Sequence, residues 1–191
     1  MKKVVVSAHV YRLTYAAICL AMAFALPFVT GQIPELGNML CPMHLPILLC
    51  GFLCGWQWGL SVGVIAPLAR SLILARPPLY PTAIAMAFEL AVYGLLAGIL
   101  YRVLPARRGY TYAALAGSML GGRVVGGFAQ LVLLSLNGKG YTAAIFFTEY
   151  FVAAWPGIVL QLVLIPLIMS ALKRAGLALD EKGNGNDPKI V

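Results

Sequence analysis

Apolar residues occur along this chain in long runs, and each run ends at a short stretch that holds proline, glycine or charge. A helix needs about 20 mainly apolar residues to cross a hydrocarbon core roughly 30 Å thick. The runs therefore predict membrane helices. They predict six, at about 11–31, 43–56, 57–75, 81–104, 110–136 and 142–174.

The second run is short, and it meets the third at the sequence CGWQWG, residues 54–59. Glycine and tryptophan in such a turn are typical of a membrane interface. A run of this length lies obliquely in the bilayer or does not span it completely.

Composition strengthens this interpretation. Of the 191 residues, 61% are hydrophobic and 10% are charged, and the mean hydropathy is +0.89. Six crossings with short loops use up this length and leave no room for a folded soluble domain. We expect an all-α membrane protein, a six-helix bundle over residues 1–174 followed by a flexible cytoplasmic tail at 175–191.

The positions of the basic residues predict an orientation. A net charge of +8 would suggest a nucleic-acid partner for a soluble protein, but here the basic residues lie mostly between spans. A cytoplasmic N-terminus leaves only Arg76 and Lys139 in external loops, as the positive-inside rule requires. It places ten basic residues inside: Lys2, Lys3, Arg12, Arg102, Arg107, Arg108, Lys173, Arg174, Lys182 and Lys189. Both termini are then cytoplasmic.

Four charged residues fall inside the predicted spans: Arg70, Glu89, Arg123 and Glu149. The arginines lie about 20 Å from the cytoplasmic ends of their helices, and the glutamates about 10–12 Å from the external ends, at about 1.5 Å per residue. All four therefore converge in the outer half of the bundle. A charge in a span costs about 2.5–3.5 kcal/mol or more, so such residues face a partner, a cavity or the bundle interior.

Further polar residues lie on the same helical faces as these charges. Gln130 follows Arg123 by seven residues, and Thr82, Met86, Glu89 and Tyr93 share one face of the fourth span. One explanation is that the arginines and glutamates pair with each other and only hold the bundle together. That explanation does not account for the apolar inner half, so we favour a small-molecule pocket that opens outward.

The external stretch GQIPELGNMLCPMH, residues 31–44, lies above this predicted pocket and contains prolines and glycines that restrict or permit turns. We expect it to act as a lid. Asn38 and His44 either hydrogen-bond a ligand there or are solvated loop residues. Tyr93 and Trp155 either stack on a ligand or serve as packing and interface anchors.

Ala17, Ala21 and Ala25 recur every four residues in the first span. Small residues at this spacing allow close helix approach, either inside the bundle or with a partner. The four cysteines, Cys19, Cys41, Cys50 and Cys54, lack a disulfide or zinc spacing. Three of them lie in or beside apolar runs, where cysteine is expected to pack as a small hydrophobe.

Phosphate-loop, zinc-hydrolase and serine-hydrolase motifs are all missing. We therefore expect neither an enzyme nor a chain with its own cofactor or metal. Any uphill transport has to draw its energy from a partner or from an ion gradient.

In these features the chain resembles the S components of energy-coupling factor (ECF) vitamin transporters. The resemblance rests on the size, the six apolar runs, the alanine series and the sequence LPILLCGFLCGWQWGLSVGVIAPLARSL. It implies a six-span plasma-membrane protein of a prokaryote that captures a micronutrient from outside. It also implies docking on a transmembrane coupling subunit with two ATPase subunits, which bind the ATP, and it makes the alanine series the docking surface.

Two further hypotheses remain beside substrate capture. A stand-alone secondary transporter or channel would use the arginines and glutamates as an ion relay. An intramembrane enzyme would have only Glu89, Glu149, His44 and the cysteines to work with. For a capture subunit, two arginines favour an acid-bearing ligand such as pantothenate or a pyridoxine-like compound.

Overall fold

The computed structural model describes residues 8–29, 39–105, 108–138, 140 and 142–175. Its regular elements within these ranges are all helical, which confirms the all-α prediction. The elements are α1 (Ala8–Val29), α3 (His44–Cys54), α4 (Trp56–Leu74), the π-helix η1 (Leu79–Ala83), α5 (Ile84–Val103), α6 (Arg108–Leu136), α7 (Ala143–Phe147), the π-helix η2 (Thr148–Val152) and α8 (Trp155–Arg174).

Five helical stretches are long and apolar enough to cross a membrane, and α3 is a shorter sixth apolar helix. The five stretches are His9–Phe28, Trp56–Leu74, Leu79–Val103, Gly109–Leu136 and Ala144–Arg174. They agree with the predicted runs, and the run predicted to be short is the one that forms the short helix.

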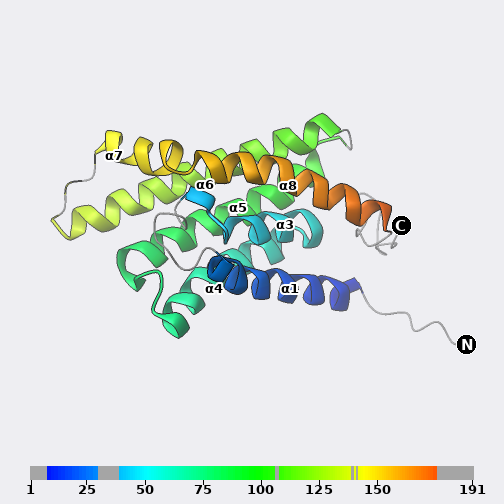
Figure 1. Ribbon diagram of the computed structural model, residues 1–191, viewed down its shortest axis with the longest axis horizontal. Coiled ribbons are helices and arrows are strands. Elements are labelled where there is room, and N and C mark those ends of the chain that lie inside the picture. The colour runs from blue at the N-terminus through cyan, green and yellow to red at the C-terminus, as the bar shows by residue number, and fades with distance from the viewer. Residues whose placement is uncertain (1–7, 30–38, 106–107, 139, 141, 176–191) are drawn as a thin grey trace, which may run out of the picture.

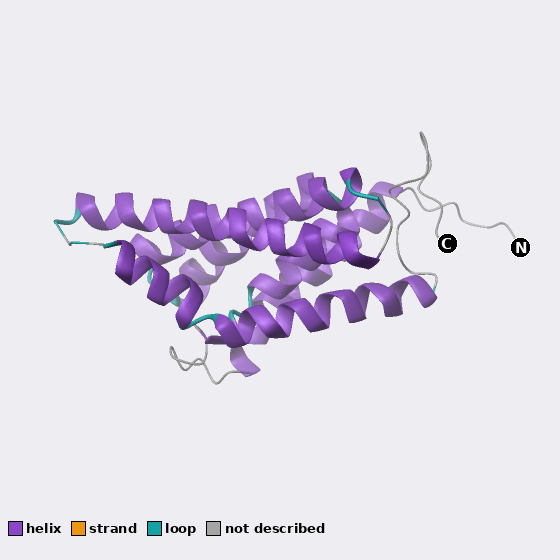
Figure 2. Ribbon diagram, turned by 90° about the horizontal axis from the view of Figure 1, so that it is seen from above, coloured by secondary structure: helices purple, strands orange, loops and turns teal. Residues whose placement is uncertain are grey.

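The helices lie lengthwise beside one another in an elongated bundle (Figures 1 and 2). α1 begins at the end of the bundle where α5 ends, α6 begins and α8 ends (Figure 1). That end carries Arg12, Arg102, Lys173 and Arg174. The positive-inside rule predicts that it is the cytoplasmic end. The opposite end, which the rule predicts to face outside, is called the outward end.

The short helix α3 occupies the centre of the bundle. All 11 of its residues are buried, and it packs against α1, α4 and α5. At about 1.5 Å per residue it covers roughly half of a hydrocarbon core. Because protein surrounds it, its length does not have to match the bilayer. It begins at His44, and its short length leaves space beyond that residue, toward the outward end.

Glycines allow the central helices to approach closely. A Cβ atom on Gly59 of α4 would lie 2.6 Å from the carbonyl oxygen of Gly94 on α5 and 2.8 Å from Cα of Gly51 on α3. All three helices therefore meet backbone to backbone at Gly59, where side chains would hold them apart. Small residues serve this purpose in membranes, where apolar burial gives no drive for helix association.

We expect Gly59→Ala to lower the thermal midpoint of the protein in detergent, because the added methyl group meets backbone on two sides. Overpacking of this kind costs about 1–3 kcal/mol. Gly109→Ala on α6 is the matched control, since no atom lies within 4 Å of its added Cβ. Equal midpoints for the two variants would show that the packing at Gly59 is looser than described.

The predicted last span, 142–174, is not one continuous helix. It divides into α7, η2 and α8, with a break before Trp155 and Pro156 at the start of α8. Proline lacks the amide hydrogen that a continuous helix needs at this point, and it disfavours helical backbone in the residue before it. Glu149, expected within a span, therefore lies on η2 and is exposed.

Candidate functional site

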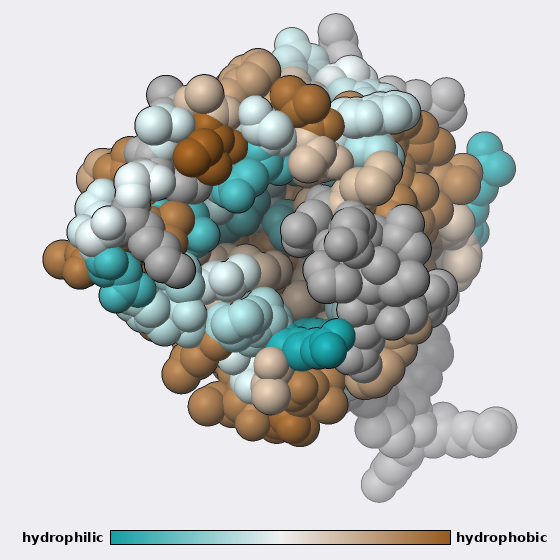
Figure 3. Space-filling view, turned by 60° about the vertical axis from the view of Figure 1, so that its left-hand side comes forward, coloured by the Kyte–Doolittle hydropathy of each residue, from teal (hydrophilic) through white to brown (hydrophobic). Residues whose placement is uncertain are grey.

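A cavity of about 780 Å³ opens at the outward end of the bundle, beyond the first residue of α3. Seen from that end, hydrophilic residues line a hollow in the surface (Figure 3). The lining comes from many elements: Pro27 of α1, Cys41, Pro42 and Met43 before α3, His44 of α3, Arg70 of α4, Ala75, Arg76, Pro77 and Pro78 after α4, Thr82 of η1, Ala85, Met86 and Glu89 of α5, Arg123 and Gln130 of α6, and Glu149, Tyr150, Ala153 and Ala154.

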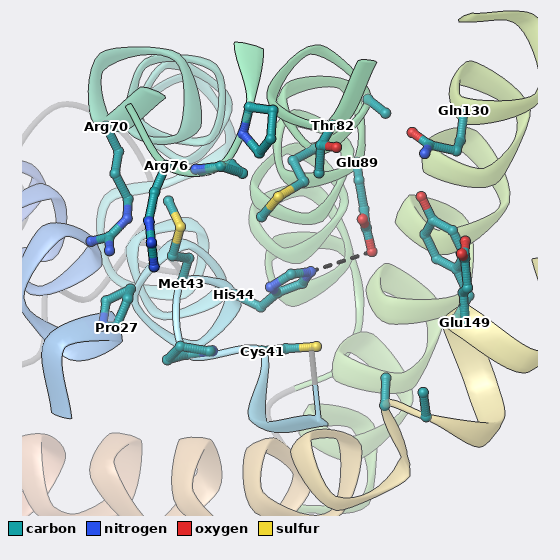
Figure 4. Close-up of a pocket in the computed structure, with 18 of the residues that line it drawn as sticks. Pro27, Cys41, Met43, His44, Arg70, Arg76, Thr82, Glu89, Gln130 and Glu149 are labelled. Carbon is teal, nitrogen blue, oxygen red and sulfur yellow. Dashed lines mark hydrogen bonds and ion pairs between the residues drawn. The ribbon is translucent and has the colours of Figure 1, made fainter. Parts of the chain in front are cut away.

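His44 and Glu89 form a buried pair at the base of this cavity. The Nε2 atom of His44 lies 3.3 Å from Oε1 of Glu89 (Figure 4), and both side chains are almost fully buried. The ring of Tyr93 packs edge-on against the imidazole at a centroid distance of 5.2 Å. A carboxylate inside a membrane protein needs such a partner, because burial without one is costly.

Glycine also sets the distance between Glu89 and the next helix. A Cβ atom on Gly126 of α6 would lie 2.7 Å from Cβ of Glu89. The backbone of α6 therefore lies directly against this side chain. Arg123 lies about one helical turn earlier on α6, and it lines the same cavity as Glu89.

Arg70 is held by the end of α1. Its Nη1 atom donates a hydrogen bond to the carbonyl oxygen of Phe24 at 2.7 Å, and its Cζ atom lies 5.3 Å from the centre of the Phe28 ring. The side chain lines the cavity on the side where Arg76 and Pro27 also lie (Figure 4). Arg70 thus links α4 to α1 as well as lining the cavity.

Arg123 is the buried cation with unused donors. It is 3% exposed, and its Nε and Nη2 atoms have no hydrogen-bond partner. Its Cζ atom lies 5.7 Å from the centre of the Phe151 ring. The neighbouring Cys41 provides no counter-charge, because burial raises the pKa of its thiol to about 12 and keeps it protonated at neutral pH.

These contacts speak against the idea that arginine–glutamate pairing merely holds the bundle together. Glu89 pairs with His44, Arg70 donates to a backbone carbonyl, and two nitrogens of Arg123 lack a partner. Buried donors normally have partners, so two unpartnered N–H groups of one cation in a cavity make Arg123 a candidate ligand contact.

Most of the predicted site residues meet at this cavity. His44, Arg70, Glu89, Arg123, Gln130 and Glu149 line it, as do Thr82 and Met86 from the predicted face of the fourth span. In Figure 4, Gln130 and Glu149 both lie on the side of the cavity away from Arg70. Cys41, Arg76 and Tyr150 also line the cavity. Sequence reasoning did not assign Cys41 to the site and treated Arg76 only as a loop charge.

Two predicted residues do not line the cavity in the part of the chain that the structure describes, and a third lies outside that part. Tyr93 is fully buried, and its ring packs edge-on against that of His44. Trp155 is 60% exposed at the start of α8 and lies outside the lining, because the break before Pro156 leaves it on the outer surface. Asn38 lies outside the described residues.

The alanine series lies on the outer surface of α1. Ala17, Ala21 and Ala25 are exposed, whereas Ala16 and Ala23 on the other face are buried. The series is therefore not an internal helix contact within the described bundle. It forms an open strip of small residues on the surface of α1.

A comparison with models of known protein families matches residues 11–173 to the ECF transporter, substrate-specific component. The chain belongs to this family. The S component is a multi-pass membrane protein that binds a substrate for uptake, associates with an ECF energising module and is not an enzyme. No curated protein and no solved structure matches this S component.

Proposed function

We propose that this S component captures an acid-bearing B-type vitamin or related micronutrient from outside a prokaryotic cell. It binds the ligand in the outward cavity of about 780 Å³ and delivers it through a shared transmembrane coupling subunit driven by two ATPases. The observation that carries the proposal is the buried Arg123, whose Nε and Nη2 atoms have no partner in that cavity. A carboxylate is the natural acceptor for them. Pantothenate and pyridoxine-like compounds are the candidates.

His44, Glu89, Arg123, Gln130 and Glu149 form the proposed contact set. The guanidinium of Arg123 binds the acid, and the carboxylates and amide accept hydrogen bonds from hydroxyl or amine groups of the ligand. Arg70 forms part of the cavity wall, and its hydrogen bond to the Phe24 carbonyl of α1 holds it in place. Tyr93 holds the His44 ring in place.

The exposed strip Ala17, Ala21 and Ala25 is the proposed docking surface for the coupling subunit. Small side chains let a partner helix approach the backbone of α1 closely. α1 also carries Pro27 in the cavity wall and the carbonyl that holds Arg70. Docking on α1 therefore touches the same helix that helps to form the binding site.

Reconstitution tests this function. In liposomes, the chain alone should bind ligand without carrying flux, and ATP-dependent uptake should appear only when the coupling subunit and both ATPases are added. Uptake by the chain alone, driven by an ion gradient, would contradict the proposal and identify a self-sufficient transporter.

A further inference from the structure

Three arginines among the described residues line the cavity, and their surroundings differ. Arg70 donates a hydrogen bond to the Phe24 carbonyl, and Arg76 is exposed. Arg123 is 3% exposed and has unpartnered nitrogens. An anion that enters the cavity gains the most binding free energy at Arg123, because the positive charge there is shielded from water and two of its N–H donors are unused.

The two unpartnered nitrogens of Arg123 belong to one edge of the guanidinium. In the planar group, the N–H of Nε and the nearer N–H of Nη2 point in the same direction and form a side-on fork. Two parallel N–H donors match the two oxygens of a carboxylate. A phosphate dianion fits less well, because Glu89 and Glu149 line the same cavity and repel a second negative charge.

The apolar part of the cavity lining is largely aliphatic. Within the described part of the chain, four prolines and two methionines line the cavity: Pro27, Pro42, Pro77, Pro78, Met43 and Met86. Among the described lining residues, Tyr150 is the one phenyl-type ring, and the imidazole of His44 is already paired with Glu89. Flat ring systems are usually held by stacking on aromatic side chains. These walls suit a saturated, bulky body better than a flat ring.

We propose that the ligand is an aliphatic monocarboxylic acid, bound side-on through its carboxylate to Nε and Nη2 of Arg123. Hydroxyl or amide groups along its body donate to Glu89, Glu149 or Gln130, and its hydrocarbon part lies against the proline and methionine walls. The assignment rests on the proposed function and narrows its ligand to one chemical class.

The test measures binding of matched probe pairs to the purified full-length protein by isothermal titration calorimetry. The aliphatic acids are pantothenate, biotin and lipoate, each paired with its uncharged form: pantothenol, biotinamide and lipoamide. The aromatic pair is 4-pyridoxate and pyridoxine. We expect at least one aliphatic acid to bind at least about tenfold more tightly than its uncharged form and than both aromatic probes, since losing a charge-assisted contact weakens binding by that factor or more.

Other outcomes overturn the assignment. If pyridoxine or an uncharged form binds as tightly as the acids, the proposed carboxylate contact is wrong. If 4-pyridoxate is the tightest ligand, the proposed aliphatic body is wrong. No binding by any acid also overturns it. In all these cases the reconstitution experiment still tests capture and ATP-driven delivery, so that part of the proposed function stands or falls separately from the ligand class.

Arg123→Lys tests the side-on geometry with the acid that binds best. Lysine keeps the positive charge but offers a point charge in place of the planar fork, so affinity should fall at least about tenfold. Arg102→Lys is the control, because Arg102 is exposed at the opposite end of α5 and should leave affinity unchanged. If Arg123→Lys and Arg102→Lys bind the acid with equal affinity, side-on binding of the carboxylate to Arg123 is wrong.

Discussion

Arg123→Ala is expected to weaken ligand binding by roughly two to four orders of magnitude. The substitution removes two charge-assisted hydrogen bonds, each contributing about 1.5–3 kcal/mol, and 1.4 kcal/mol corresponds to a tenfold change in affinity. The affinity is measured by calorimetry with the small molecule that purifies with the wild-type protein.

The same variant should remain folded without ligand. In the ligand-free protein, Arg123 is a buried cation with two unpartnered donors, and its removal relieves a desolvation penalty. We therefore expect an unchanged or higher thermal midpoint. Val124→Ala, at an exposed position of the same helix, is the control and should keep wild-type affinity. Wild-type affinity in Arg123→Ala would place the ligand elsewhere.

Ala21→Trp is expected to prevent assembly with the coupling subunit while leaving ligand affinity unchanged. Ala21 is exposed in the middle of the alanine strip, and an indole there blocks the close approach that small residues allow. Overpacking of about 1–3 kcal/mol, together with the lost helix contacts, should lower complex yield at least about tenfold. Copurification with the tagged coupling subunit and ATP-driven uptake are the measurements.

Ala116→Trp is the matched control for this prediction. Ala116 is an exposed alanine on α6, on a different helix from the strip, so the same change there should leave assembly intact. Normal assembly of Ala21→Trp would show that the partner docks elsewhere. Weakened ligand binding in Ala21→Trp would show that the alanine contributes to the fold of the bundle.

Sequence reasoning located the helices because membrane helices are specified by long apolar runs. The short second run was predicted to be unusual, and α3 is indeed a short helix. Its complete burial was not predictable from the run alone, since an apolar helix has the same composition whether lipid or protein surrounds it. That burial comes from the glycine contacts among α3, α4 and α5.

Charged residues in spans were a strong signal for the site. Arg70, Glu89 and Arg123 are all buried and line the cavity, as their cost in a bilayer suggests. Their individual partners depend on the fold: the His44 ring for Glu89, and a backbone carbonyl 46 residues away for Arg70. The sequence cannot show which donors are left unpartnered, and this distinguishes Arg123 from Arg70.

The break near Pro156 was not predicted. The apolar run over 142–174 does form one span-length helical stretch, but a break before Trp155 divides it into α7, η2 and α8. Trp155 at this break is exposed and lies outside the cavity lining. Cys41 was not predicted to line the site. Its place beside Arg123 arises from the turn before α3, where its backbone has a positive φ of 46°.

The most direct test of capture is mass spectrometry of the small molecules released from gently purified wild-type protein and from Arg123→Ala. We predict about one acid-bearing molecule per wild-type chain and none from the variant. A wild-type extract as empty as that of the variant, or the same molecule in both at equal amounts, would contradict ligand capture at Arg123.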